Sequence, residues 1–224
     1  MQDFESTFGQ GGLNDQVSVD TLMDECGLDA DEIAWRKAFI GFDDADARRL
    51  ADMQDLFADQ ADRIAEDFYE NLTQYAETQD VIGRSDKGIE QLKRTQSAYL
   101  VSLADGEYGT DYFRNRARIG KLHDLLEMPM KHYIGQYGVY YDLLMPLLME
   151  RMGDRLLARL DDELDDADGA AVERAVRSEV DEGLAEVLAV LRIINLDMQV
   201  VADTYIHSYS EDLAATVEEN EQLM

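Results

Sequence analysis

The chain has 224 residues, of which 46% are apolar, enough for a hydrophobic core and too many for a disordered chain. Its 49 acidic and 20 basic side chains give a net charge of −29, which repels nucleic-acid phosphates and anionic lipid headgroups. No uncharged stretch approaches the roughly 20 residues that cross a bilayer, and no basic leader precedes an apolar run. The single cysteine, Cys26, excludes a disulfide framework, a thiolate zinc site and covalent attachment of haem through a C-x-x-C-H motif. We therefore expect a soluble protein of the cytoplasm.

The acid excess is typical of proteins from a salt-rich cytoplasm. Aspartate supplies 30 of the 49 acids, and only five of the 20 basic residues are lysine. In dilute buffer such a surface repels itself and destabilises the compact state, whereas at about 1 M salt the screening length falls to roughly 3 Å. We therefore favour a halophilic protein that loses structure at low ionic strength over a generic acidic protein.

Apolar residues have helical spacing along almost the whole chain, and no segment has the alternation of a strand. We expect a mobile tail over residues 1–17 and then a short helix over 18–27, capped by Ser18 and ended by Gly27. Further helices are expected over 45–76 (one bent helix or two), 85–106, 110–126 and 130–152, the last restarting after Pro129.

The last predicted helix is too long for a compact domain. After an acidic stretch at 154–169, which we expect to be a helix end and a loop, helical spacing continues over 171–220. A helix of about 45 residues reaches nearly 70 Å at 1.5 Å per residue. Its apolar side chains, among them Leu184, Leu188 and Leu191, need a partner along its length. We expect the last two long helices to form an antiparallel four-helix bundle with a second copy.

Three histidines leave few choices for metal or acid–base chemistry: His123, His132 and His207. None has a Glu three residues before it, as ferritin-like sites require, and a di-iron oxygen carrier requires about five imidazoles. G-x-S-x-G and GxxxxGK motifs are absent from the sequence, as are strands for a nucleotide-binding fold. The sequence therefore excludes di-iron sites, serine hydrolases and the usual nucleotide-binding enzymes.

His123 shares an apolar helical stripe with Ile119, Leu122 and Leu126, so we expect its ring to be buried. A buried imidazole needs a partner for each ring nitrogen. One interpretation is a core histidine bonded to the backbone or to a tyrosine. The other is a ligand to a flat apolar cofactor, with the Tyr133 hydroxyl fixing the ring tautomer. The lining of such a pocket would be aromatic and methionine-rich: Phe68, Tyr69, Met128, Met130, Tyr137, Tyr140 and Tyr141.

Four segments resemble a known family by their order and spacing: Phe68-Tyr69-Glu70-Asn71-Leu72, Leu92-Lys93-Arg94-Thr95, Arg116-Ala117-Arg118-Ile119-Gly120-Lys121-Leu122-His123 and Lys131-His132-Tyr133. Together they resemble globin-coupled sensor domains, and more narrowly the sensor half of archaeal haem-based aerotaxis transducers. The resemblance spans residues 20–215. It implies an all-α globin fold with an extra N-terminal helix, its long last two helices forming the dimeric four-helix bundle.

The resemblance also implies a noncovalent b-type haem whose iron is bound by the imidazole of His123. The Tyr133 hydroxyl would bond the other ring nitrogen. His132 departs from some relatives, which have a bulky aromatic residue there, and we assign it no role.

On the ligand side of the haem, the resemblance implies one apolar and one hydrogen-bonding set of residues. Leu92 would be an apolar wall, and Phe68 would contact the cofactor. The hydroxyls of Tyr69 and Thr95 would stabilise bound dioxygen.

The implied function is reversible binding of dioxygen, with carbon monoxide and nitric oxide as further ligands, by a homodimeric sensor that is not an enzyme. Residues 18–200 would form the sensor domain. Residues 201–224 would lead to a methyl-accepting module, outside this chain, that controls a chemotaxis histidine kinase. The alternative is a haem-free helical signalling or dimerisation module with His123 in its core. A haem peroxidase or dioxygenase is disfavoured, because Tyr69 and Thr95 are poor proton shuttles near neutral pH.

Overall fold

The computed structural model describes residues 12–164 and 169–222, and every regular element in these ranges is helical, as predicted. In chain order the elements are the 3-10 helix η1 (Gly12–Gln16) and the α-helices α2 (Val19–Glu25), α3 (Ala30–Phe39), α4 (Asp44–Ala51), α5 (Gln54–Leu72), α6 (Ala76–Gly83), α7 (Ile89–Ser102), α8 (Thr110–Leu125), α9 (Met130–Leu164) and α10 (Gly169–Gln222). Most of the predicted tail, residues 1–11, lies outside the described residues. None of the described helices has the length and apolar composition to cross a membrane.

Local sequence signals explain where several helices begin and end. Ser18 occupies the predicted N-cap position of α2, but its hydroxyl bonds to that of Thr21 at 2.7 Å and makes no hydrogen bond to the helix backbone. Gly27, with φ +63°, follows the C-cap, as predicted. Asp43 and Asp46 form a capping box at the start of α4. The chain breaks at Asp52 and Met53, so the stretch predicted as one bent helix or two forms two helices, α4 and α5.

Two helices, α3 and α6, were not predicted. Each buries few side chains, Ile33 and Arg36 in α3 and Val81 in α6, so the apolar periodicity of these segments is weak. Helix α7 begins at Ile89 rather than at residue 85, because residues 84–88 form a turn.

The two last helices are longer than predicted. Helix α9 passes the expected end at Gly153 and continues to Leu164. A glycine inside a helix costs only about 1 kcal/mol, and Arg155 and Arg159 in the following turns pair with Glu179 of α10 at 3.2 and 3.1 Å. Part of the expected acidic loop, residues 165–168, lies outside the described residues. Helix α10 has 54 residues, a length of about 80 Å.

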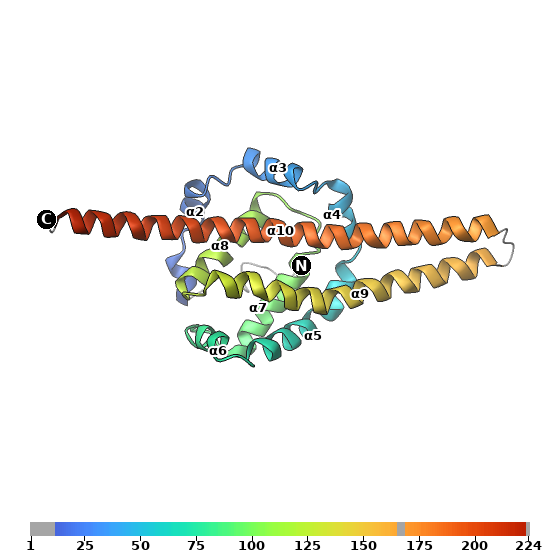
Figure 1. The fold of residues 1–224 in the computed structure, drawn as a ribbon, viewed down its shortest axis with the longest axis horizontal. Helices are drawn as coiled ribbons and strands as arrows, with labels where there is room; N and C mark the ends of the chain where they lie inside the picture. Colours follow the sequence, from blue (N-terminus) through green and yellow to red (C-terminus); the bar gives the residue numbers. More distant parts are fainter. Residues whose placement is uncertain (1–11, 165–168, 223–224) are drawn as a thin grey trace.

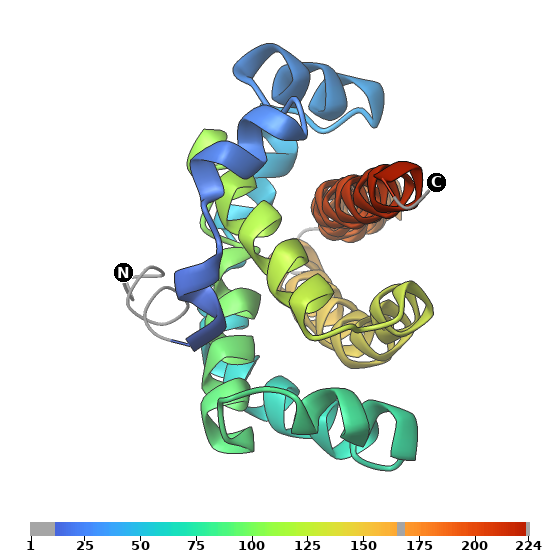
Figure 2. The ribbon, with the colours of Figure 1, turned by 90° about the vertical axis from the view of Figure 1, so that its left-hand side faces the viewer.

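Helices α9 and α10 lie side by side and antiparallel, and both extend past the body at the end where they are joined (Figure 1). The other end of α10 extends from the opposite side of the body. Figure 2 shows α2 to α8 arching along one side of this pair, with α3 and α6 at the two ends of the arch. Where α8 crosses α10, a Cβ at Gly120 would lie 2.1 Å from Thr204 Oγ1 and 3.2 Å from Val201 Cα. Only glycine permits this close approach.

A buried ion pair joins α8 to α10. Arg116 Nε donates to Asp197 Oδ2 at 2.9 Å, and both side chains are fully buried. The hydroxyls of Tyr99 and Tyr112 also donate to this carboxylate, at 2.9 and 2.7 Å. Their rings lie 4.7 and 4.0 Å from the guanidinium carbon. The two charges are therefore paired and hydrogen-bonded, which buried charges require.

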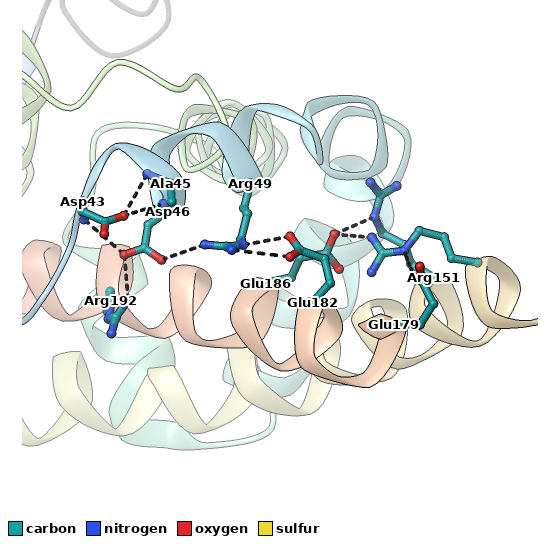
Figure 3. Close-up of polar contacts among 10 residues, drawn as sticks. Asp43, Ala45, Asp46, Arg49, Arg151, Glu179, Glu182, Glu186 and Arg192 are labelled. Atoms are coloured by element: carbon teal, nitrogen blue, oxygen red, sulfur yellow. Dashed lines mark hydrogen bonds and ion pairs between the residues drawn. The ribbon is translucent and has the colours of Figure 1, made fainter. Parts of the chain in front are cut away.

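A second set of ion pairs ties α4 and α9 to α10 (Figure 3). The pairs are Arg192–Asp46 at 2.7 Å, Arg49–Glu182 at 2.8 Å and Arg151–Glu186 at 3.4 Å. Several of the chain's few basic side chains thus bridge helices.

Candidate functional site

A pocket lies among α5, α6, α7, α8 and α9, with Leu13 and Asn14 of η1 also in its lining. Its empty space, counted together with the open solvent at its mouth, is about 1090 Å³. The six site residues expected from the sequence all line this pocket: Phe68, Tyr69, Leu92, Thr95, His123 and Tyr133. The fold thus brings together side chains from four helices that span 66 positions of the sequence.

His123 is a titratable group of the pocket wall whose protonation is altered by burial. It lies in the last turn of α8, and within the described residues its buried Nδ1 atom has no hydrogen-bond partner. Burial lowers the pKa of the imidazole from 6.5 to about 4, so the ring is neutral at pH 7. A neutral imidazole offers the lone pair that a metal ion takes. The bond to backbone or tyrosine expected of a core histidine is missing at Nδ1.

Tyr133 lies beside His123, with 5.5 Å between ring centroids, but its hydroxyl has a different partner from the one expected. It is 2.6 Å from the hydroxyl of Tyr137. Residues 133 and 137 are one turn apart on α9, which places both phenols on the same buried face. The expected bond from Tyr133 to His123 is therefore replaced by a tyrosine pair next to the imidazole.

Phe68 and Tyr69 of α5 form another part of the lining. Phe68 stacks on Tyr140 of α9, with 4.8 Å between centroids, and makes an edge contact with Tyr69. Burial raises the pKa of the Tyr69 phenol far above pH 7, so this hydroxyl keeps its proton and is able to donate a hydrogen bond. Among the described residues no hydrogen bond of the Tyr69 hydroxyl is found.

Helix α7 contributes Leu92 and Thr95, as expected, and also Gln96. The Thr95 hydroxyl donates to the carbonyl of Gln91 at 3.0 Å, a local bond that leaves its oxygen able to accept. The Gln96 amide donates to the Tyr140 hydroxyl within the pocket lining.

Sequence reasoning missed several residues of the lining. Gln96 lies one turn after Leu92, and Gln136 three residues after Tyr133, so helical spacing from known positions was a signal for both. Val81 and Ile82 had no such signal, because α6 itself was not predicted. The other two histidines, which received no role, do not line this pocket.

The lining is mainly aromatic and aliphatic, with one neutral imidazole, a few hydroxyl and amide groups, and the charged side chains of Asp86 and Lys87. An unpartnered imidazole in such a pocket fits the axial ligand of a haem iron, and the flat faces of Phe68, Tyr137 and Tyr140 suit a planar ring system. The residues present therefore fit a noncovalent porphyrin.

The sequence pattern of the protoglobin family matches residues 29–211, which include all six expected site residues. The chain belongs to the protoglobin family. The resemblance to globin-coupled sensors and the predicted globin fold are thereby confirmed, and the long last helix is present.

The chain is also similar to an individual protein and to a solved structure. The "heme-based aerotactic transducer HemAT" of Halobacterium salinarum is 37% identical over 225 residues, which cover the whole of this chain and 42% of the relative. The chain thus spans less than half the length of that relative. The globin domain of a Geobacter sulfurreducens globin-coupled sensor has the same fold, with a TM-score of 0.60 and 21% identity over 77% of this chain and 96% of that domain.

Proposed function

We propose that this chain is a haem-based dioxygen sensor domain of a chemotaxis transducer. The observation that carries the proposal is the neutral imidazole of His123 in an aromatic pocket, whose buried Nδ1 has no hydrogen-bond partner among the described residues. The name of the Halobacterium relative supports the same assignment. Haem b, when bound, supplies the iron that takes up the gas, with carbon monoxide and nitric oxide as further ligands.

The residues of the pocket have distinct roles in this proposal. His123 holds the iron, and Tyr133 packs beside its ring. Phe68 and Leu92 exclude water from the cofactor. The protonated Tyr69 hydroxyl donates a hydrogen bond to a ligand in the pocket, and Thr95 is a second hydroxyl nearby. None of these distal groups is an efficient proton shuttle at pH 7, which favours binding over catalysis.

Hydrogen bonds link the backbone near His123 to α10, so a displacement of His123 can move the last helix. The backbone carbonyl of His123 accepts from Met128 N at 3.0 Å, and Met128 O accepts from the Tyr205 hydroxyl of α10 at 3.0 Å. Two residues earlier on α8, Lys121 Nζ donates to Ser208 Oγ at 2.7 Å. We infer that α10 carries the signal toward a methyl-accepting module and a histidine kinase in the cytoplasm.

The exposed face of α10 supports a homodimer. Large apolar side chains exposed on this helix share an arc of about 100°, at about 100° of rotation per residue; they are Val180, Leu184, Leu188, Ile206, Tyr209, Leu213 and Val217. A stripe of this length on a sensor helix is typical of an interface with another helix. We infer that α9 and α10 form an antiparallel four-helix bundle with those of a second copy.

An absorption spectrum of the chain reconstituted with hemin tests the haem proposal. We expect a Soret band that shifts between the deoxygenated and the air-equilibrated sample at high salt. His123→Leu should lose most of the bound haem and the Soret band of histidine-bound haem. His132 lies outside the pocket, so His132→Leu should retain both. A chain that takes up no hemin would favour the haem-free signalling module, and an unchanged spectrum in His123→Leu would refute the assigned ligand.

A further inference from the structure

A second group of possible metal ligands lies where α2 meets α10, away from the pocket. His207 Nε2 is 3.1 Å from Glu25 Oε2 and 3.6 Å from Glu211 Oε2. One ligand atom from each of these residues lies within 4.8 Å of the other two. Glu25 comes from α2, 182 positions before His207, and none of the three lines the pocket.

These distances are close to those that a tetrahedral ion imposes. Bond lengths of about 2.0–2.2 Å to nitrogen and oxygen place neighbouring ligand atoms about 3.3 Å apart. The two separations from His207 Nε2, 3.1 and 3.6 Å, lie on either side of this value. His207 and Glu211 are four residues apart on one helix face, so both can reach the same ion without backbone change. Only the two carboxylates have to approach each other.

The surroundings of the group are negatively charged and partly shielded from solvent. The side chain of His207 is 22% exposed, and those of Glu25 and Glu211 are about half exposed. Glu25 and Glu211 place two carboxylates beside the imidazole of His207. A divalent cation would relieve this negative potential.

We propose that Glu25, His207 and Glu211 form a binding site for a divalent first-row transition ion, Zn²⁺ being the best match. The imidazole distinguishes the site from an oxygen-only cluster, which would favour Mg²⁺ or Ca²⁺. Three protein ligands leave a fourth position for water. The alternative is a protonated His207 that only forms ion pairs with the two glutamates.

An ion at this position would link α2 to α10 close to the point where α10 leaves the body (Figure 1). Because α10 is the helix that extends beyond the domain, the link would restrain the segment that passes a signal on. The metal proposal does not depend on whether the pocket holds haem.

Equilibrium dialysis of the full chain against Zn²⁺ in high-salt buffer, followed by elemental analysis, tests the site. We expect one tightly bound zinc per chain, not displaced by millimolar Mg²⁺. His207→Ala and Glu211→Gln should each weaken binding at least about tenfold. His132→Ala, which removes a partly buried histidine elsewhere, should leave binding unchanged.

Hydrogen exchange supplies a second readout, because an ion that joins two helices slows exchange in both. With Zn²⁺ the amides of residues 19–25 should exchange more slowly in the wild-type chain and not in His207→Ala. The absorption spectrum of the reconstituted chain and the far-ultraviolet circular dichroism should be the same in all variants, which shows that they fold. Equal zinc binding by the wild type and His207→Ala, displacement by Mg²⁺, or unchanged exchange in α2 would each overturn the proposal.

Discussion

At the scale of single residues, the burial of His123 makes the stability of the domain depend on pH. The pKa of the ring is 6.5 in an unfolded chain and about 4 in the folded one. Below pH 6.5 the unfolded chain therefore binds a proton that the folded chain does not, so the free energy of unfolding falls as pH decreases from about 6.5 to about 4. The whole effect amounts to about 3 kcal/mol.

We predict that His123→Leu removes this pH dependence. Between pH 7 and pH 5 the free energy of unfolding of the wild-type chain should fall by about 2 kcal/mol more than that of the variant. Urea unfolding of both chains, prepared without hemin and in the same high salt, measures the difference at the two pH values. The carboxylates titrate alike in both chains and cancel. Equal decreases would show that the ring is already protonated or exposed in the fold.

For Tyr69→Phe we predict faster release of dioxygen by roughly tenfold, because one hydrogen bond to a ligand contributes about 1–1.5 kcal/mol. Phenylalanine keeps the ring contact with Phe68, so the pocket should keep its shape. Stopped-flow displacement of dioxygen by carbon monoxide gives the rate, and Tyr75→Phe, at an exposed tyrosine, serves as control. An unchanged rate in Tyr69→Phe would assign the donor to another group, with Thr95 the next candidate.

Some residues of the pocket could be predicted from the sequence, but their hydrogen bonds could not. Helical spacing and motif order place His123, Tyr133 and Tyr69 correctly on the pocket. Whether the Tyr133 hydroxyl meets an imidazole or the phenol of Tyr137 depends on side-chain positions of a few ångströms, which periodicity does not encode.

At the scale of helices, those that bury more apolar side chains were predicted from the sequence, and those that bury few were missed. Helix α5 buries six side chains on one face and was predicted, whereas α6 buries only Val81 and was missed. The end of α9 was misplaced for a different reason. Gly153 marks a stop only when nothing follows that favours helix, and here Arg155 and Arg159 gain partners on α10 by continuing it.

The contact between α8 and α10 includes the ion pair of Arg116 and Asp197. No sequence pattern predicts this pair, because the two residues are 81 positions apart. We predict that Asp197→Leu lowers the free energy of unfolding by about 3–5 kcal/mol, because it leaves a buried guanidinium without a counter-charge. Replacing both partners, as in Arg116→Met with Asp197→Leu, should restore most of the loss. Urea unfolding of the single and double variants measures both effects. A mild single variant would mean that water reaches Arg116 in the folded chain.

At the scale of the whole molecule, two electrostatic effects of salt oppose each other. The ion pairs of Figure 3 are only partly buried and weaken as salt rises. The repulsion of a net charge of −29 weakens as well, and it acts over the whole surface. We predict that repulsion dominates, so the thermal midpoint should rise between about 0.1 and about 3 M KCl. A midpoint that does not change, followed by circular dichroism, would contradict a halophilic surface.

The domain division stays a prediction: a tail at 1–17, a sensor domain at 18–200 and a linker at 201–224. The continuity of α10 is a physical reason to expect no sharp boundary at residue 200. The helix crosses residue 200 without interruption. Val200, Val201, Thr204 and Tyr205 are all buried, so the packing of the body continues past the expected boundary. The exposed stripe of α10 continues along the same helix, so body and projecting segment share one rigid element.

The dimer proposed for this stripe can be tested in its N-terminal half. Leu184 and Leu188 are 57% and 48% exposed, whereas Leu191, also expected at the interface, is partly covered by the chain itself. We predict that Leu184→Glu with Leu188→Glu gives monomers in sedimentation velocity at high salt, since buried glutamates would face their copies across the bundle. Tyr75→Glu, at a position 54% exposed on another helix, should remain a dimer. If the double variant also sediments as a dimer, the copies meet through another surface, and the apolar stripe of α10 is left for a different helix.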